Sequence, residues 1–288
     1  MAVVNYLSFD VEEWFHSSNF DDIIARDQWM ELGGRVQRNV SRILEVLAGR
    51  QVKATFFILG WVAEQFPQMV REIASGGHEI GAHGYGHRLI HSQTPAEFEA
   101  DVKKCLGCLS QAGAPDVAGY RAPSYSVTRD SLWALDVLVE LGFRYDSSVY
   151  PVRFHNRYGI PDAPRSPHLI RPSLAEFPLP VVDLGGMLVP VATGAYFRLF
   201  PYAVTRAAMR RLNRAGLPVT VDLHPWELDT GQPYVKLPLS RGFRHYTNLG
   251  RMEARLRRLI DEFEFREIAA GLAGLMPVPG VSSAVRAS

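Results

Sequence analysis

The feature that most constrains this chain is a repeated alternation of short apolar runs with amphipathic stretches. Residues 3–9 (VVNYLSF) and 52–60 (VKATFFILG) are apolar and of strand length, whereas residues 33–49 and 94–113 place apolar side chains at helical spacing. Such alternation recurs at least five times, which predicts an α/β fold with a mainly parallel sheet. Because loops after the carboxyl ends of parallel strands carry the chemistry in such folds, polar residues at those ends are the candidate site residues.

The composition excludes several classes of protein. Apolar residues make up 47% of the 288, enough for a large core, and the formal net charge of +1 gives no general attraction to nucleic acid. No apolar run reaches the roughly 18 residues of a membrane-spanning helix, and the first ten residues lack the basic start of a secretory signal. We therefore expect a cytoplasmic protein without a transmembrane segment.

The two cysteines, Cys105 and Cys108, form a C-x-x-C motif inside a predicted helix. Cys105 shares an apolar face with Phe98, Val102 and Leu109. We therefore expect core or half-buried thiols rather than a redox motif, and a zinc knuckle would need a second pair. Two cysteines cannot build a disulfide framework, which agrees with a reducing compartment.

No break in composition divides the chain into two domains. We expect a single domain over residues 1–270, with an irregular insertion at 151–175 and a C-terminal extension from about residue 231. The tail, residues 271–288, is rich in small residues and Pro and is expected to be flexible. These patterns give no prediction of the oligomeric state.

Three histidines fall in the segment HEIGAHGYGH, residues 78–87. His83 and His87 are four apart, so on a helical turn their imidazoles would lie on one face, about 5–6 Å apart at Cβ, and could chelate a divalent ion. The glycines between them let the backbone turn tightly. Taken alone, the spacing also fits a solvated or capping pair. His78 and His91 are expected to pack or lie at the surface rather than to bind metal.

The segment SFDVEEWFH places carboxylates at the end of an apolar strand. Asp10 and Glu12 point to one side of an extended chain, and Val11 and Glu13 point to the other. A carboxylate in this partly desolvated place needs a metal ion or an arginine as its partner, although a solvated acidic turn also fits. Glu13 is the alternative to Glu12.

Three further polar residues follow predicted strands. In YRAPSYS, Arg121 stays charged and either fixes a carboxylate of the site or forms a structural ion pair. In VDLHPWELD, His224 is placed for general acid or base work, or is a satisfied structural histidine. Asp146 ends the predicted strand in FRYDSSV.

The order of these motifs over residues 3–230 resembles the NodB-type polysaccharide deacetylases (carbohydrate esterase family 4). HEIGAHGYGH and GYRAPSYS carry the family pattern. SFDVEEWFH, YDSSVYP, EFPLP, LHPWELD and FRHYTNL resemble the subgroup from exosortase-associated exopolysaccharide loci, which has a C-terminal extension. The resemblance implies a distorted (β/α)7-type barrel with its site at the carboxyl ends of the strands.

One departure from the family pattern concerns the first motif. Most of the family has two consecutive aspartates there, a base followed by a metal ligand, whereas here Val11 follows Asp10. Strand alternation then selects Glu12 as the replacement ligand. The residues assigned to the metal are Glu12, His83 and His87, a set that suits zinc but also cobalt, nickel or iron.

The resemblance implies a metal-dependent hydrolase that removes N-acetyl groups from a polysaccharide, or from its lipid-linked precursor, and releases acetate. Asp10 would act as the base, held charged by Arg121, and His224 as the acid, oriented by Asp146. The Tyr125 backbone N–H would stabilise the oxyanion. The aromatic residues expected either to stack on sugar rings or to pack in the core are Trp14, Tyr125 and Trp226. His245 could line the cleft.

Two rival hypotheses stay open. One is an allantoinase-like or imidase-like hydrolase of small cyclic amides, because atypical first motifs occur among such relatives. The other is a non-catalytic carbohydrate-binding relative that has lost its metal. The implied partners of the leading hypothesis are the N-acetylated polysaccharide and the exopolysaccharide-synthesis machinery.

Overall fold

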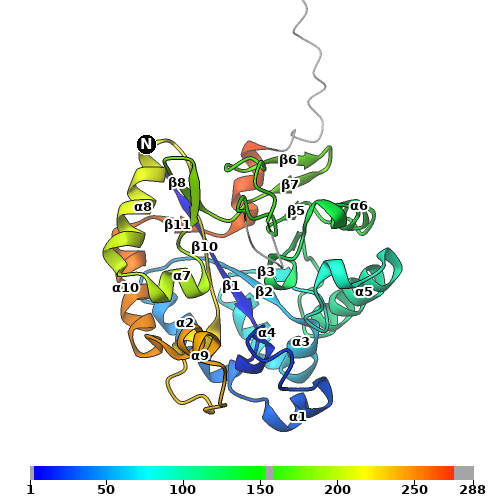
Figure 1. Cartoon of the computed structure of the whole chain (residues 1–288). Coiled ribbons are helices and arrows are strands. Elements are labelled where there is room, and N and C mark those ends of the chain that lie inside the picture. The colour runs from blue at the N-terminus through cyan, green and yellow to red at the C-terminus, as the bar shows by residue number, and fades with distance from the viewer. Residues whose placement is uncertain (1–2, 154–158, 276–288) are drawn as a thin grey trace, which may run out of the picture.

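The computed structural model describes residues 3–153 and 159–275 as an α/β fold built on a curled, mostly parallel sheet (Figure 1). Seven parallel strands follow the order β10-β1-β2-β3-β4-β5-β7, and β6 extends the sheet antiparallel to β7. Their bounds are β1 (Asn5–Val11), β2 (Thr55–Ile58), β3 (Glu79–Ala82), β4 (Gly119–Tyr120), β5 (Tyr145–Asp146), β6 (His168–Arg171), β7 (Leu174–Glu176) and β10 (Thr220–Leu223). The predicted class, an α/β fold with a distorted (β/α)7-type barrel of mainly parallel strands, is confirmed, and the sheet is curled into a half-barrel.

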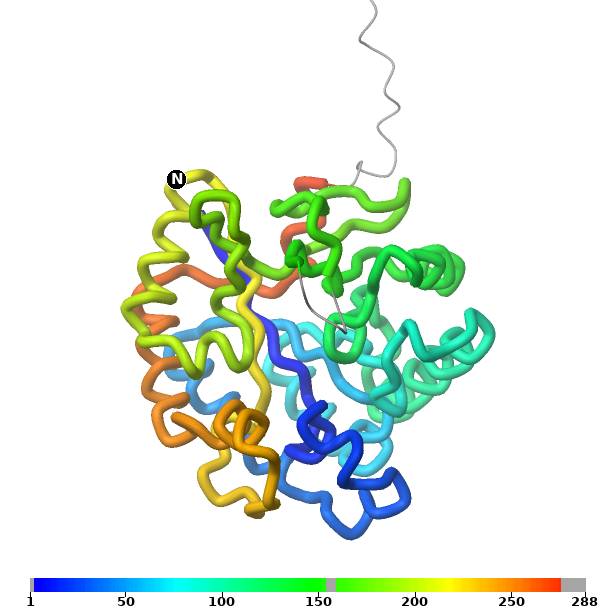
Figure 2. Tube along the Cα trace, in the orientation of Figure 1, coloured from blue at the N-terminus to red at the C-terminus, as the bar shows by residue number. Residues whose placement is uncertain are grey.

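Three short strands complete the β-structure. β11 (Phe265–Arg266) pairs with the start of β1. β8 (Val181–Leu184) and β9 (Met187–Pro190) form a separate antiparallel hairpin, and Thr193 just beyond it bridges to Asp222 of β10. Figure 2 shows β1 and β10 side by side, although 200 or more residues separate them, and their register pairs Tyr6 with Thr220 and Phe9 with Leu223.

Helices lie around the outside of the sheet (Figure 1). Their bounds are α1 (Trp29–Leu32), α2 (Val36–Ala48), α3 (Gly60–Gln65), α4 (Pro67–Ser75), α5 (Pro95–Gln111), α6 (Trp133–Glu140), α7 (Gly194–Leu199), α8 (Tyr202–Arg214), α9 (Leu239–Tyr246) and α10 (Met252–Glu262). Thr94 caps α5 and forms a reciprocal capping box with Glu97, because the first turn of a helix leaves backbone donors unpaired. None of the helices in the described ranges is long and apolar enough to cross a membrane.

The two faces of β1 belong to different environments. Leu7, Phe9 and Val11 are buried in the main core together with side chains of the surrounding helices. Tyr6 points the other way, into a second cluster that fills the concave side of the sheet. That cluster includes Phe57, and the 3-10 helix η8 (Ile268–Gly274) adds two of its residues. The alternation therefore directs Ser8, Asp10 and Glu12 toward the concave side, as their contacts there confirm.

The remaining predictions about organisation meet mixed outcomes. Cys105 is buried and Cys108 half-buried, both as free thiols, as predicted. The predicted irregular insertion at 151–175 contains β6 and the start of β7, so it is more regular than expected, and its residues 154–158 lie outside the described residues. Of the predicted flexible tail, η8 includes residues as far as Gly274, and residues 276–288 lie outside the described residues.

Glu13, two residues beyond β1, anchors the start of α2. Its Oε1 accepts hydrogen bonds from the backbone N–H groups of Gly34, Arg35 and Val36, at 2.8, 2.7 and 2.9 Å. These donors lack carbonyl partners within the helix, and the positive end of the helix dipole also favours a carboxylate. Glu13 therefore has a structural role on the side of the chain away from Asp10 and Glu12.

Replacing Glu13 with Ala is expected to lower the free energy of unfolding by about 1–3 kcal/mol, because buried amide donors lose their acceptor. Urea denaturation measures this loss. Glu45→Ala on the exposed face of α2 is the matched control and should change stability by less than about 0.5 kcal/mol. Equal midpoints for the two variants would contradict the anchoring role.

Candidate active site

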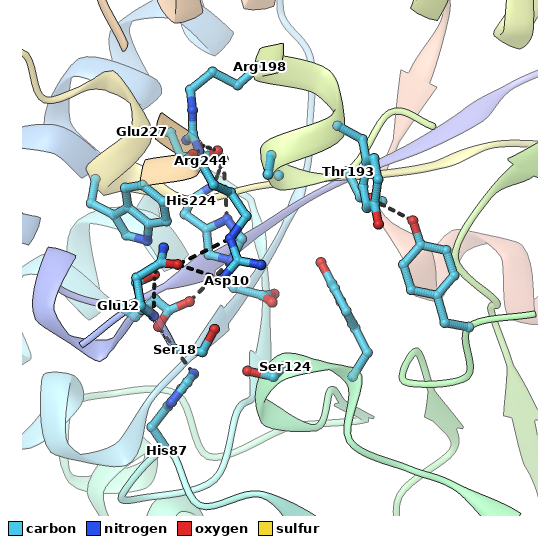
Figure 3. Close-up of a pocket in the computed structure, with 18 residues that line it drawn as sticks. Asp10, Glu12, Ser18, His87, Ser124, Thr193, Arg198, His224, Glu227 and Arg244 are labelled. Carbon is cyan, nitrogen blue, oxygen red and sulfur yellow. Dashed lines mark hydrogen bonds and ion pairs between the residues drawn. The ribbon is translucent and has the colours of Figure 1, made fainter. Parts of the chain in front are cut away.

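A pocket opens where the carboxyl ends of β1 and β10 meet (Figure 3). Residues that follow β1 and residues that follow β10 both line this pocket, although they are far apart in the sequence. They meet because the two strands are parallel and end at the same edge of the sheet. The predicted site residues that line it are Asp10, Glu12, His87, Tyr125, His224 and Trp226. Figure 3 shows His87 and His224 approaching Glu12 from opposite sides.

Glu12, His83 and His87 form a cluster that fits a metal ion. One ligand atom from each lies within 4.8 Å of the other two. His83 Nδ1 is 2.8 Å from the carbonyl oxygen of Arg121, so Nδ1 donates and Nε2 keeps its lone pair. His83 Nε2 and Glu12 Oε2 are buried and make no hydrogen bond, and Glu12 Oε2 lies 3.2 Å from His87 Nε2. Unsatisfied acceptors facing one another in a buried place are what a divalent cation would satisfy.

The backbone between the two histidines is a loop, not a helical turn, so that detail of the prediction is wrong. Gly84 has φ 71° and His87 has φ 49°, both in the left-handed region. The imidazole centroids of His83 and His87 nevertheless lie 5.7 Å apart. A left-handed conformation strains a residue with a Cβ, and such strain concentrates at functional sites.

Arg121 is fully buried and organises the carboxylates at the bottom of the pocket. One of its terminal nitrogens donates to Ser8 Oγ at 2.7 Å, to Asp10 Oδ1 at 2.9 Å and to Asp222 Oδ1 at 2.6 Å. The other guanidinium nitrogens donate to the backbone carbonyl and hydroxyl of Ser147. Asp10 is therefore held by charge and by geometry, as predicted.

The packing of Arg121 on the ring of Phe57 requires a glycine at position 81. The guanidinium lies 4.2 Å from the ring centroid of Phe57. A Cβ at Gly81 would stand 2.4 Å from that ring, so only glycine leaves room for it. The glycines of the histidine motif thus serve packing beneath the site as well as the turn of the loop.

Burial and charge shift the pKa values of the carboxylates in opposite directions. Burial raises the pKa of Asp10 against the opposing effect of Arg121. Burial, followed by the charge of Asp10, raises the pKa of Asp222 to about 7. Burial also acts on Glu12, but His87 and His224 outweigh it and lower its pKa to about 2. Glu12 therefore stays ionised more readily than Asp10 and Asp222.

His224 lies between two glutamates. Its Nε2 is 3.1 Å from Glu12 Oε1, and its Nδ1 is 3.2 Å from Glu227 Oε2. Glu227 is fully buried and pairs with the buried Arg198 at 2.6 Å. Burial lowers the pKa of His224, but the two glutamates overcome it and raise that pKa well above its usual value. Glu227 is thus the residue that orients the His224 ring.

The prediction that Asp146 orients His224 is wrong. Asp146 is buried at the end of β5, where Ser148 Oγ donates to its Oδ1 at 2.5 Å. Its register partner on β7 is Glu176, and burial raises the pKa of Asp146 to about 6. The side chain is engaged with its own strand and its neighbour, so it does not reach the histidine.

The three predicted aromatic residues have different surroundings. Trp14 is 1% exposed and packs edge-on against Phe15 and Phe20, so the prediction that it stacks on sugar is wrong. Trp226 lines the pocket and is stacked on His245, with ring centroids 4.5 Å apart and planes at 13°. His245 is itself buried, and it supports the wall from behind rather than lining the pocket.

Tyr125 lines the pocket, but its backbone is not free to bind an oxyanion in this structure. Its N–H donates to the carbonyl of Ala122 at 2.9 Å. Its hydroxyl donates to Asp222 Oδ2. Both Ser124 and Tyr125 have positive φ, 52° and 54°. The predicted oxyanion donor is therefore corrected to a side chain that buttresses Asp222.

The two functional residues that the sequence reasoning missed are Asp222 and Glu227. Asp222 stands two residues before His224 on β10, so strand alternation places both side chains on one face. Strand alternation also selects Asp10 and Glu12, so the same rule could have identified Asp222 from the sequence. His78 is half-buried beside Phe56 and His91 is exposed, and neither belongs to the metal cluster, as expected.

The fold and site define an α/β protein with a curled, mostly parallel sheet and a carboxylate–histidine cluster at its strand ends. Residues 15–145 match the family model described as polysaccharide deacetylase, and residues 147–273 match the model described as a domain of unknown function, DUF3473. The first part of the chain is thus similar to polysaccharide deacetylases, and the second part is similar to DUF3473.

Similarity to individual proteins covers part of the chain in sequence and nearly all of it in structure. The chain is 33% identical over 118 residues to peptidoglycan deacetylase-like protein FGM2 of Gibberella zeae, covering 40% of this chain and 33% of that protein. It is 39% identical over 84 residues to peptidoglycan-N-acetylglucosamine deacetylase of Bacillus cereus, covering 29% and 28%. The alignments therefore span about a third of these relatives. The crystal structure of a putative polysaccharide deacetylase from Mycobacterium smegmatis matches with a TM-score of 0.64 and 20% identity, over 99% of this chain and 96% of that one, which shows a common fold.

Replacing His83 or Glu12 with Ala is expected to abolish retention of a divalent metal, because each change removes one of the three candidate ligands. Metal analysis of the purified variants after dialysis measures this. Glu13→Ala and His91→Ala are the controls and should keep the metal content of the unaltered protein. A stoichiometric metal in Glu12→Ala would show that another group supplies the oxygen ligand.

Proposed function

We propose that this protein is a metal-dependent hydrolase that removes N-acetyl groups from an N-acetylated polysaccharide and releases acetate. The observation that carries the proposal is the cluster of Glu12, His83 and His87 beside an arginine-held Asp10, with Asp10, Glu12 and His87 lining one pocket. The relatives named above, a peptidoglycan-N-acetylglucosamine deacetylase among them, support the reaction class.

The metal would be held by Glu12, His83 and His87. Two imidazole nitrogens and one carboxylate suit zinc, and also cobalt, nickel or iron. A divalent ion there would supply Lewis-acid chemistry toward an amide carbonyl and a water molecule. The hydrogen bond from His83 Nδ1 to the Arg121 carbonyl fixes the ring so that Nε2 faces the cluster.

Asp10 would accept the proton of the attacking water. Its Oδ1 is bound by Arg121, and its Oδ2 is 3.7 Å from His83 Nε2, so the free oxygen faces the metal cluster. Arg121 divides its positive charge between Asp10 and Asp222. A fixed carboxylate with one free oxygen toward the reacting atoms is the arrangement that general-base catalysis needs.

His224 would donate a proton to the departing sugar amine. Its Nε2 faces the pocket beside Glu12, while Glu227 holds Nδ1 on the opposite edge of the ring. Arg198 in turn fixes Glu227. The Trp226 ring, 5.4 Å from the His224 ring, and the Tyr125 ring would contact the sugar at the pocket walls.

The sequence motifs further suggest that the substrate is an exopolysaccharide, as in the exosortase-associated subgroup. Acetate release by the metal-loaded protein tests the reaction, with N-acetylated oligosaccharides and polysaccharides as substrates. O-acetylated glycans and small cyclic amides serve as comparison substrates. Turnover confined to cyclic amides would favour the imidase-like alternative, and absence of both bound metal and turnover would favour the carbohydrate-binding alternative.

Replacing Asp10 with Asn is expected to lower turnover by about 10²–10⁴-fold while the metal stays bound, because the base is lost but no ligand is. Acetate release and metal content are measured on the same preparation. The exposed Asp116→Asn is the matched control and should retain full activity. Near-normal turnover in Asp10→Asn would remove Asp10 as the base.

Replacing Glu227 with Gln is expected to reduce kcat by about 10²-fold with metal retained, because His224 loses the charged partner on Nδ1. Asp146→Asn, also at a buried carboxylate, should leave the kcat of the folded protein within a few-fold. Steady-state kinetics and metal analysis distinguish the two variants. The reverse pattern would restore Asp146 as the partner of His224.

A further inference from the structure

Large apolar side chains stand exposed on and around α9. Leu239 is 93% exposed and Phe243 is 64% exposed, and they lie four positions apart, so both project from one face of the helix. Tyr234 is 79% exposed and Ile23 is 41% exposed. We call these four residues, Ile23, Tyr234, Leu239 and Phe243, the α9 patch. Exposed apolar residues that cluster in this way mark an interaction surface.

Contacts between neighbouring side chains bring the members of the α9 patch together. Arg241 of α9 forms an ion pair with Asp22, which places the neighbouring Ile23 beside the helix. The ring of Tyr234 lies 5.1 Å from that of Tyr246, the last residue of α9. The patch therefore joins the N-terminal loop to the C-terminal extension.

The α9 patch also adjoins the mouth of the active-site pocket. Arg244, next to Phe243, donates two hydrogen bonds to Asn19 Oδ1. Both Arg244 and Asn19 line the pocket. A surface on which the patch rested would therefore lie beside the pocket entrance.

The segment that carries the patch is basic. Residues 230–251 contain Lys236, Arg241, Arg244 and Arg251 and no Asp or Glu, whereas the whole chain has a formal net charge of only +1. The facing loop contributes Asp21 and Asp22, and Asp22 is engaged with Arg241. Apolar side chains flanked by arginine and lysine are typical of helices that lie in the interface of an anionic bilayer.

We propose that the α9 patch docks this protein on the surface of an anionic lipid bilayer. Leu239 and Phe243 would enter the boundary between head groups and acyl chains, and Lys236 would contact the lipid phosphates. Four side chains are few for a stable protein partner, which needs roughly 800 Å² on each side. A soluble polyanion would bind the basic side chains but leave Leu239 and Phe243 in water. An anionic bilayer accounts for both the basic and the apolar side chains. Docking would turn the pocket entrance toward substrate presented at the membrane.

Co-sedimentation of the full chain with vesicles tests the docking. Binding is expected to vesicles of phosphatidylcholine that contain phosphatidylglycerol, to be weaker with phosphatidylcholine alone, and to fall as salt rises. The double variant L239S/F243S is expected to bind the anionic vesicles about tenfold more weakly or worse, since each side chain loses its apolar burial.

The matched control is L184S/M187S at the turn of the β8–β9 hairpin. Leu184 is 53% exposed and Met187 is 63% exposed, so the control removes similar apolar surface. Figure 1 shows β8 at the upper left of the molecule and α9 at the lower left, with α7 between them. The control is expected to bind like the unaltered protein. Circular dichroism and thermal melting check that both variants fold.

Three results would overturn the proposal. They are absence of binding to anionic vesicles, equal binding by L239S/F243S, and equal loss of binding in the hairpin control. Binding of soluble dextran sulfate that equals vesicle binding in strength, and that L239S/F243S leaves unchanged, would likewise replace lipid with a polyanion. Acetate release from a soluble substrate should be unaffected by L239S/F243S, so the docking and the proposed activity fail or succeed separately.

Discussion

The buried guanidinium of Arg121 is the interaction on which the rest of the site depends. A fully buried charge is costly unless its partners surround it, and Asp10 and Asp222 supply two carboxylates from neighbouring strands. Those strands must pair in one register for both contacts to form. The backbone carbonyl of the same residue accepts from His83 and so sets the tautomer of the ring that we propose as a metal ligand. One position therefore holds both the proposed base and a proposed ligand.

The two segments that match different family models build a single sheet and a single pocket. β7 and β10, from residues 147–273, pair with β5 and β1 of the preceding part. The DUF3473 segment contributes His224 and Glu227 to the pocket, and Asp222 to the arginine network beneath it. Glu12 lies before residue 15, outside both matched segments, yet it stands between the histidines of the two. The geometry assigns this segment of unknown function half of the pocket wall.

Sequence reasoning recovers what the strand ends dictate. The parallel fold and the meeting of Asp10, Glu12 and Arg121 follow from alternation along β1 and from parallel strands ending at one edge. Sequence reasoning does not predict contacts that depend on the conformation of the loops between strands. Glu227, rather than Asp146, reaches His224 because a tight 3-10 turn, Pro225–Leu228, folds it back, and no periodicity reports that turn. The other incorrect predictions concerned sugar stacking by Trp14, oxyanion binding by the Tyr125 amide and a helical turn at His87. Each depends on tertiary packing or loop conformation, which the sequence pattern does not report.

The central claim is that one divalent ion binds between Glu12, His83 and His87, with Asp10 outside its ligand set. Anomalous diffraction at the absorption edge of the bound metal measures this most directly, in crystals of the metal-loaded protein. The account predicts one strong peak within bonding distance of Glu12 and both histidines. A peak held instead by Asp10, Asp222 and His224, the other cluster of potential ligands in the described part of the chain, would contradict it.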